Sequence, residues 1–333
     1  MRSLASRMRR HEDGVASTVG TLMALLVFLT FLSLITNQYV PVYMKDAESS
    51  HTNSALGQFS AMKGAIDLQA LAAQSAGSEY VPVTAATAVT LGLDGVPIFA
   101  VPTVGRLRSD PDAGPFTVVF DYFIRSPSGG DFQTRVREQS NGSIVLSVFN
   151  RYYVPQTVVY ENGAVIRSQQ DGQVVRAPPT FLVSKVNGTL QLHFDLVSLY
   201  GRGEITGTGT EVVNTRLFAT DHQTYDRFPG NAVIWINHTS AYGLAWYQFL
   251  NTTLGSSLNL PGTYTSTPLD QSFTARVGGE VAYRITVSYL PTTKQYITRL
   301  EIHNTALLPF ESFRVRHAQV QVGIGEAPED VLK

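Results

Sequence analysis

The sequence predicts an α+β protein in which a long N-terminal helix, partly transmembrane and partly amphipathic, precedes a mainly antiparallel β-sandwich with one short inserted helix. Three observations support this fold class. Residues 15–35 form a run of 21 uncharged residues, apolar residues then recur at helical spacing as far as residue 73, and beyond residue 77 they alternate with a period of two. The expected parts are a leader (1–14), a transmembrane helix (15–40), an amphipathic stalk helix (41–76) and a sandwich domain (80–325).

The uncharged run is long enough to cross about 30 Å of hydrocarbon as a helix. Tyr39 and Tyr43 follow it at the distance where aromatic residues gather at membrane–water interfaces. Pro41 removes one helical hydrogen bond, so we expect a bend there without an end to the helix. The sequence therefore predicts a single-pass membrane protein.

The distribution of charge predicts how this helix is oriented in the membrane. The first 14 residues hold four of the 25 basic and two of the 26 acidic residues, which leaves the body with 21 and 24 and a charge of −3. The basic head predicts a cytoplasmic N-terminus and an extracellular body. A body so nearly neutral has no broad cationic field, so we expect no nucleic-acid partner. The chain has no cysteine, which excludes disulfides, thiolate nucleophiles and cysteine metal sites.

The sequence at the junction between the basic head and the helix is similar to that of a known family. Residues 9–14 read RRHEDG and residues 15–23 read VASTVGTLM. This arrangement resembles the start of archaeal type IV pilins and pilin-like surface proteins, whose class III signal peptide is cut before the helix. The resemblance implies cleavage between Gly14 and Val15 by a prepilin-type peptidase, and self-assembly or association with other pilin-like subunits through the helix. An uncleaved signal anchor is the alternative, and acidic residues before Gly14 depart from the pattern.

The second half of the helix has one apolar face. Its members lie three or four residues apart and are Leu56, Phe59, Met62, Ile66, Ala70 and Ala73. A face of this kind packs against a domain, whether in a pilin-like protein or in a plain stalk. The pattern does not separate these two interpretations.

The alternating apolar pattern of the body predicts β-strands. The expected strands cover residues 83–91, 96–101, 116–124, 132–137, 143–149, 157–160, 165–169, 181–186, 189–194, 204–218, 232–237, 271–277, 280–289, 295–303 and 311–322. Turn pairs between them begin at Asp94, Asn141, Asn162, Asp171, Asn187 and Gly278, each followed by glycine. Such spacing favours an antiparallel sandwich over a parallel sheet.

A helix over residues 241–254 interrupts the strands. Tyr242, Ala245, Trp246, Phe249, Leu250 and Thr253 share one face of it, and Thr239 or Ser240 is available as its N-cap. This helix, the segment VYENGA at 159–164 and the segment from Asp171-Gly172 to Ala177-Pro178-Pro179 resemble an uncharacterised archaeal family of pilin-like, membrane-anchored proteins. The resemblance implies architecture and location.

Motifs for chemistry are absent. The chain has no G-x-S-x-G, H-E-x-x-H or P-loop pattern, and the glycine-rich stretch 201–209 is expected to be a strand with bulges or a flat edge and not a phosphate-binding loop. Asp110 to Gly114 reads as a turn and not a calcium loop. Asp221, His222 and Asp226 read as a solvated loop after a strand. We therefore expect no catalytic residue, no cofactor, no metal site and no enzyme activity.

Four N-x-S/T sequons are candidate N-glycosylation sites, at Asn141, Asn187, Asn237 and Asn251. Asn141 and Asn187 fall at expected hairpin tips, and Asn251 falls on the expected helix. Two functions fit the sequence. The first is a pilin-like structural protein of the cell surface, such as a minor subunit of a type IV pilus-like filament. The second is an anchored sandwich that binds a glycan or another cell-surface partner.

Overall fold

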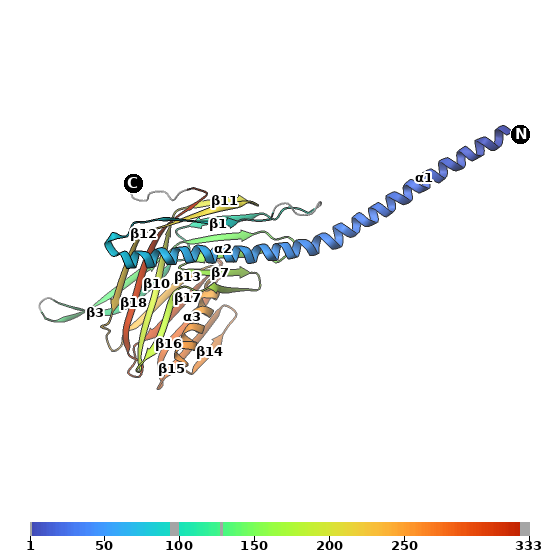
Figure 1. The fold of residues 1–333 in the computed structure, drawn as a ribbon. Helices are drawn as coiled ribbons and strands as arrows, with labels where there is room; N and C mark the ends of the chain where they lie inside the picture. Colours follow the sequence, from blue (N-terminus) through green and yellow to red (C-terminus); the bar gives the residue numbers. More distant parts are fainter. Residues whose placement is uncertain (1, 94–99, 127–128, 327–333) are drawn as a thin grey trace.

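One continuous helix organises the molecule. The computed structural model describes residues 2–93, 100–126 and 129–326, and in it the helix comprises α1 (Arg2–Leu34), a π-helical turn η1 (Ile35–Tyr39) and α2 (Val40–Ala76). Figure 1 shows α1 projecting far from a β-rich body along which α2 lies. The predicted long helix is confirmed, and so is the change of pattern after Ala76.

The junction of the two helical parts is irregular beside Pro41. The backbone N–H of Val40 donates to the carbonyl of Ile35, five residues earlier, which makes the turn π-helical. A proline leaves a carbonyl of the preceding turn without its usual donor, and a wider turn accommodates this without ending the helix. Figure 1 shows the helix axis changing direction between α1 and α2.

Eighteen strands of the described residues form three sheets. The five-stranded sheet has the order β1 (Thr84–Thr90), β12 (Thr210–Tyr225), β18 (Phe310–Ile324), β10 (Thr189–Tyr200) and β9 (Phe181–Val186). The six-stranded sheet has the order β11 (Gly203–Gly207), β2 (Gly105–Asp110), β5 (Ser143–Val148), β6 (Gln156–Glu161), β7 (Ala164–Gln169) and β8 (Gly172–Ala177). The seven-stranded sheet has the order β14 (Gly262–Ser266), β15 (Asp270–Val277), β16 (Glu280–Leu290), β17 (Gln295–His303), β13 (Val233–Ser240), β3 (Phe116–Arg125) and β4 (Asp131–Ser140).

The five-stranded sheet uses both of its faces. In β10, Phe194 and Leu196 pack into the core that the seven-stranded sheet lines, whereas Val197 and Leu199 pack into the core that α2 and the six-stranded sheet line. Neighbouring side chains of a strand point to opposite faces, so this strand is buried on both sides. The predicted α+β class with mostly antiparallel sheets is confirmed, and the body has two cores around one central sheet.

The strand pairing departs from a purely antiparallel pattern at one place. Among the described strands, β10 and β18 form the one parallel pair, which runs from Leu190 and Phe310 to Tyr200 and Gln321. Parallel neighbours need a long connection, and about 110 residues separate these two strands.

The inserted helix is confirmed as α3 (Gly243–Leu258). Trp246 and Leu250 on its inner face are buried in the core of the seven-stranded sheet. Its N-cap residue is Tyr242, so the prediction of Thr239 or Ser240 was wrong. The Ser240 hydroxyl instead accepts a hydrogen bond from the Tyr242 N–H, two residues on, as serine does in turns.

Several strand and turn assignments change. Three strands lack an apolar run and were missed: β2, β8 and β14. The expected strand 204–218 is two strands, β11 and the first half of β12, which belong to different sheets. The expected strand 96–101 and the turn at Asp94 fall largely outside the described residues. The turn at Asn141 is not a hairpin, because it joins β4 of one sheet to β5 of another.

Candidate functional site

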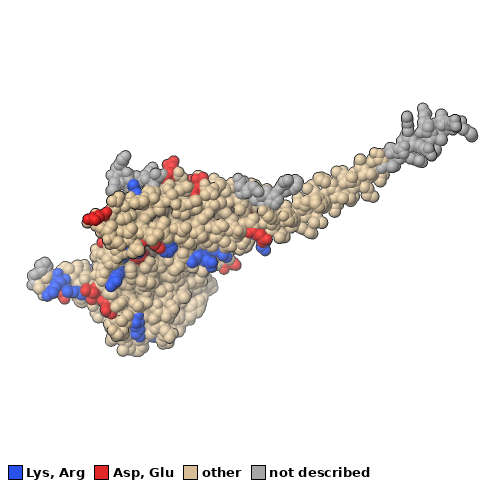
Figure 2. Space-filling view, in the orientation of Figure 1, with Lys and Arg blue, Asp and Glu red and all other residues tan. Residues whose placement is uncertain are grey.

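The apolar part of α1 does not pack against the body. From Val19 to Leu34 its large apolar side chains are at least 50% exposed, apart from the half-buried Leu32. Within the described residues, this is the one helix long and apolar enough to cross a membrane, and none of its apolar window is buried against the body. Figure 2 shows the described part of the projection without charged side chains until it reaches the body. A surface this apolar needs lipid or other helices to cover it.

The apolar face of α2 is docked on the body. All six predicted residues are buried, from Leu56 to Ala73. Two glutamines fix the edges of the contact. Gln58 accepts from the N–H of Thr90 (3.0 Å), and Gln69 accepts from the N–H of Leu217 (2.7 Å). Thr90 ends β1 and Leu217 belongs to β12, so the two hydrogen bonds hold α2 in a fixed register on the five-stranded sheet.

A buried carboxylate holds the start of the docked segment. The side chain of Glu48 is fully buried and accepts four hydrogen bonds: from the Thr103 hydroxyl (2.7 Å) and from the backbone N–H groups of Arg151 (2.9 Å), Tyr152 (2.9 Å) and Tyr153 (2.6 Å). Three consecutive N–H groups that converge on one carboxylate form an anion-binding nest. Glu48 acts only as an acceptor, as an ionised carboxylate does. We call this contact the Glu48 latch.

A histidine lies beside the latch. His51 Nε2 is 3.0 Å from the carbonyl oxygen of Thr90. Burial lowers the pKa of His51 below its ordinary value, although the Thr90 carbonyl and the charge of Glu48 favour the protonated form. A neutral imidazole that donates from Nε2 satisfies this geometry.

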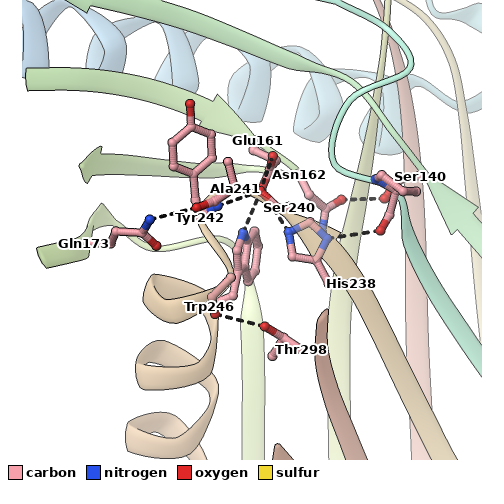
Figure 3. A network of polar contacts seen from close by, with 12 residues as sticks. Ser140, Glu161, Asn162, Gln173, His238, Ser240, Ala241, Tyr242, Trp246 and Thr298 are labelled. Carbon is pink, nitrogen blue, oxygen red and sulfur yellow. Dashed lines mark hydrogen bonds and ion pairs between the residues drawn. The ribbon is translucent and has the colours of Figure 1, made fainter. Parts of the chain in front are cut away.

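A second buried carboxylate lies where the sheets meet (Figure 3). Glu161 at the end of β6 accepts from the indole N–H of Trp246 (2.9 Å) and the hydroxyl of Ser240 (3.0 Å), and its Oε1 is 2.8 Å from His238 Nε2. His238 Nδ1 faces the carbonyl oxygen of Pro115 at 3.2 Å. One proton between Nε2 and Oε1 satisfies both groups, whichever of them holds it.

The adjacent hairpin tip extends this network. Asn162 and Gly163 have φ angles of +43° and +78°, as a tight two-residue hairpin requires. The Asn162 side-chain oxygen accepts from the Ser140 hydroxyl (2.7 Å) and from the N–H of Val197 (2.9 Å). The network therefore joins β6, β4, β10, β13 and α3, and so all three sheets.

Ser240 and His238 each contact the Glu161 carboxylate, and all three side chains are buried. Buried polar groups that satisfy one another stabilise and specify a core. The described residues hold no group of three or more His, Asp or Glu side chains placed to bind a metal. Figure 2 shows charged side chains of both signs in small groups over the visible face of the body.

The remaining predicted residues are scattered. Asp221 and His222 are exposed on β12, so the expected loop is a strand there, because β12 continues to Tyr225 in pairing with β18. Asp110 ends β2 and the predicted turn follows it at residues 111–114. Residues 203–207 form β11, a strand at the edge of the six-stranded sheet.

The signal-peptide and glycosylation residues take different positions. Gly14 and Val15 lie inside α1. Asn187 is exposed at the β9–β10 hairpin tip, as predicted. Asn141 is half-buried at the crossing between sheets, Asn237 lies on β13 and Asn251 lies on α3.

Sequence comparison adds one finding. A family described only as of unknown function (DUF7289) matches residues 152–289. Comparisons with curated proteins and with solved structures gave no match. The matched segment contains Glu161, Gln173, His238 and Trp246, and Gln173 donates to the Ala241 carbonyl (2.7 Å) at the start of α3. The chain thus shares with that family the stretch that carries most of the buried network.

Neither buried carboxylate was predicted from the sequence. Glu48 stands on the buried face of α2, one turn after Met44 and one turn before Thr52. Glu161 ends a strand directly after Val158, Val159 and Tyr160 and just before Asn162-Gly163. A charged residue at an apolar position is the signal that finds such groups, since an unpaired buried charge is costly.

Proposed function

We propose that this chain is a pilin-like, membrane-anchored structural protein of the cell surface. The observation that carries the proposal is the division of one helix into a bare apolar half and a docked half. The bare half crosses a membrane, or packs with other helices in a filament, while the docked half holds the body beside it. The basic head stays in the cytoplasm and the body is extracellular. In this role the protein performs no catalysis and needs no cofactor.

Processing fits the same proposal. A prepilin-type peptidase cuts between Gly14 and Val15, which leaves the whole apolar run in the mature protein. Mass spectrometry of the mature N-terminus tests this step. A first residue of Val15 supports pilin-like processing, whereas an intact Met1 contradicts it and leaves a plain anchor.

Assembly needs a separate test. Electron microscopy of surface filaments from cells with and without this chain, with antibody labelling of the body, tests whether it is a filament subunit. Labelled filaments support a minor subunit, and filaments that lack the label contradict assembly. Fractionation in carbonate tests the anchor itself, because a transmembrane protein stays with the membrane pellet.

A second candidate function is an anchored binding or adhesion module. A cleft of about 150 Å³ lies beside the start of α3, and its wall includes Leu269, Tyr289 and Tyr296. The two tyrosine rings are 4.9 Å apart. Aromatic rings with polar neighbours suit a sugar or a peptide side chain. Binding of the detergent-solubilised full chain to a glycan array, compared with Tyr289→Ala, tests this function.

A further inference from the structure

Two loops at the end of the body from which the helix leaves have an unusual surface. We call residues 101–104 and 149–154 the rim loops. They read VPTV and FNRYYV, so they contain one basic residue, Arg151, and no acidic residue. Phe149 is 54% exposed, Val101 is 50% exposed and Val154 is 42% exposed.

The rim loops form one surface. The N–H of Phe149 donates to the carbonyl of Val104 (3.0 Å), which joins the two loops. The Asn150 amide donates to the carbonyl of Val154 (2.9 Å), which closes the second loop on itself. The exposed apolar side chains are therefore held near one another and are not the ends of independent loops.

The Glu48 latch fixes the distance of the rim loops from the anchor. Both loops donate to the Glu48 carboxylate. Glu48 lies five residues after Tyr43 on the same helix, which is about 8 Å along the axis at 1.5 Å per residue. The polar headgroup layer on each side of a bilayer is about 6 Å thick, since the full bilayer is roughly 40–45 Å and its core about 30 Å. With Tyr43 at the inner edge of this layer, Glu48 lies about 2 Å beyond its outer edge. Val40 and Met44 are also buried, so the body extends along the helix past Tyr43, and the side of the body that carries the rim loops reaches the level of the headgroups.

The position of the rim loops in the fold agrees with this. Gln156 at the start of β6 pairs with Gln169 at the end of β7, so the loop 149–154 lies at the end toward which β7 points. Figure 1 shows that β7 points toward the side of the body where the helix leaves it.

The composition of the rim loops matches a lipid interface. Tyrosine and other aromatic residues are enriched at that depth, and arginine is attracted to anionic lipid headgroups. An exposed apolar surface in water is unfavourable, and the same surface is covered when it lies against lipid.

We propose that the rim loops rest in the headgroup layer of the bilayer that α1 crosses, with Phe149 and Val154 at the interface and Arg151 at a lipid phosphate. This inference rests on the membrane anchorage proposed above. The body then has two attachments to one membrane, the helix and the rim loops, and these fix its tilt. A single anchor with a bend near Pro41 would leave the body free to swing.

Because the chain has no cysteine, single labels test this contact directly. The full chain carrying Val154→Cys is labelled with a nitroxide and reconstituted in vesicles of phosphatidylcholine and phosphatidylglycerol. Collision of the label with oxygen, which concentrates in lipid, is compared with collision with a water-soluble nickel complex.

Two positions calibrate the measurement. Val27→Cys on α1 reports the bilayer core. Val186→Cys is the matched control, since Val186 is also a valine and is also 42% exposed. It pairs with Thr189 at the β9–β10 hairpin tip, and the next residue, Leu190, packs into the core that α2 does not line. Thermal unfolding of each variant confirms its fold, and Val101→Cys replaces Val154→Cys if the latter does not fold.

The outcomes separate the two proposals. We expect the label at 154 to lose accessibility to the nickel complex relative to the label at 186, and this loss to diminish with Arg151→Gln in the same vesicles. A label at 154 as accessible as that at 186, with the label at 27 in lipid, overturns the rim-loop contact and leaves the anchor standing. A label at 27 that is itself exposed to water overturns both.

Discussion

Replacement of Glu48 by glutamine should loosen the docked helix. The carboxylate accepts two hydrogen bonds at each oxygen, from Thr103 and Arg151 at Oε1 and from Tyr152 and Tyr153 at Oε2. In Glu48→Gln, the NH₂ group faces either the N–H groups of Tyr152 and Tyr153 or the N–H of Arg151 and the Thr103 hydroxyl, which can turn to accept. At least one buried N–H donor is then unsatisfied at about 1–3 kcal/mol, and the remaining bonds lose their charge at about 1 kcal/mol each. The expected loss is about 4 kcal/mol.

The size of this loss makes it measurable. For a body of this size, about 4 kcal/mol lowers the melting temperature by roughly 10 °C. It also raises the amide hydrogen exchange of residues 151–153 by roughly a thousandfold if opening of the latch exposes them. Both are measured on the full chain in detergent micelles, by circular dichroism and by exchange with mass spectrometry.

A matched control excludes a general effect of lost charge. Glu79 is an exposed glutamate just beyond the end of α2, so Glu79→Gln should change the free energy of unfolding by less than about 0.5 kcal/mol. The reasoning is refuted if Glu48→Gln melts with the wild type and its amides at 151–153 exchange at unchanged rates.

Three further predictions follow from other parts of the chain. Leu26→Arg should cost about 3 kcal/mol of membrane insertion and move the protein from the carbonate-washed pellet to the supernatant, whereas Leu71→Arg, on the exposed face of the docked helix, should stay in the pellet. Trp246→Phe removes one donor from the buried Glu161 carboxylate and should cost about 1.5–3 kcal/mol in denaturant unfolding; Trp235 remains as the fluorophore, and an unchanged midpoint would contradict the network. Burial lowers the pKa of His51, so the unfolded chain binds more protons, and the free energy of unfolding falls as the pH drops below about 6.5 toward the pKa of the folded state. The free energy of unfolding should change less with pH across this range in His51→Gln than in the wild type. Equal pH dependence of the two proteins would count against the assignment.

The helix and the hairpins were predictable because each rests on local rules. Twenty-one uncharged residues leave few alternatives to an apolar helix, and Asn162-Gly163, Asn187-Gly188 and Gly278-Gly279 each close a hairpin between neighbouring strands. The positive φ angles at these pairs are a property of the residues themselves.

The order of the strands in the sheets and the strand β2 were not predictable, because both depend on contacts between distant parts of the chain. In β2 the inward positions are Gly105, Leu107 and Ser109, so one apolar residue marks the buried face and the strand looks polar. Gly105 is small because Leu91 lies against its Cα; a Cβ there would be 1.9 Å from the Leu91 carbonyl oxygen. The cause of the pattern is a contact between distant segments, which no window of the sequence contains.

The two buried carboxylates were missed because nothing near them in the sequence marks their partners. Three of the four groups that contact Glu48 are N–H groups, which every residue but proline carries. Glu161 does have side-chain partners, but they lie about 80 residues away at His238, Ser240 and Trp246. An acidic residue on an apolar face was visible in the sequence, whereas its partners were not.

The central position of β18 sets the order in which the molecule can fold. This strand lies between β12 and β10 and pairs with segments about 100 residues or more earlier in the chain. Its residues Ala318, Val320 and Val322 are also part of the surface on which α2 docks. Contacts of such long range form late, because the loop they close is costly in entropy. During synthesis the apolar face of α2 must therefore stay without its full packing surface for most of the time that the rest of the chain is made. That surface is complete only when β18 has emerged.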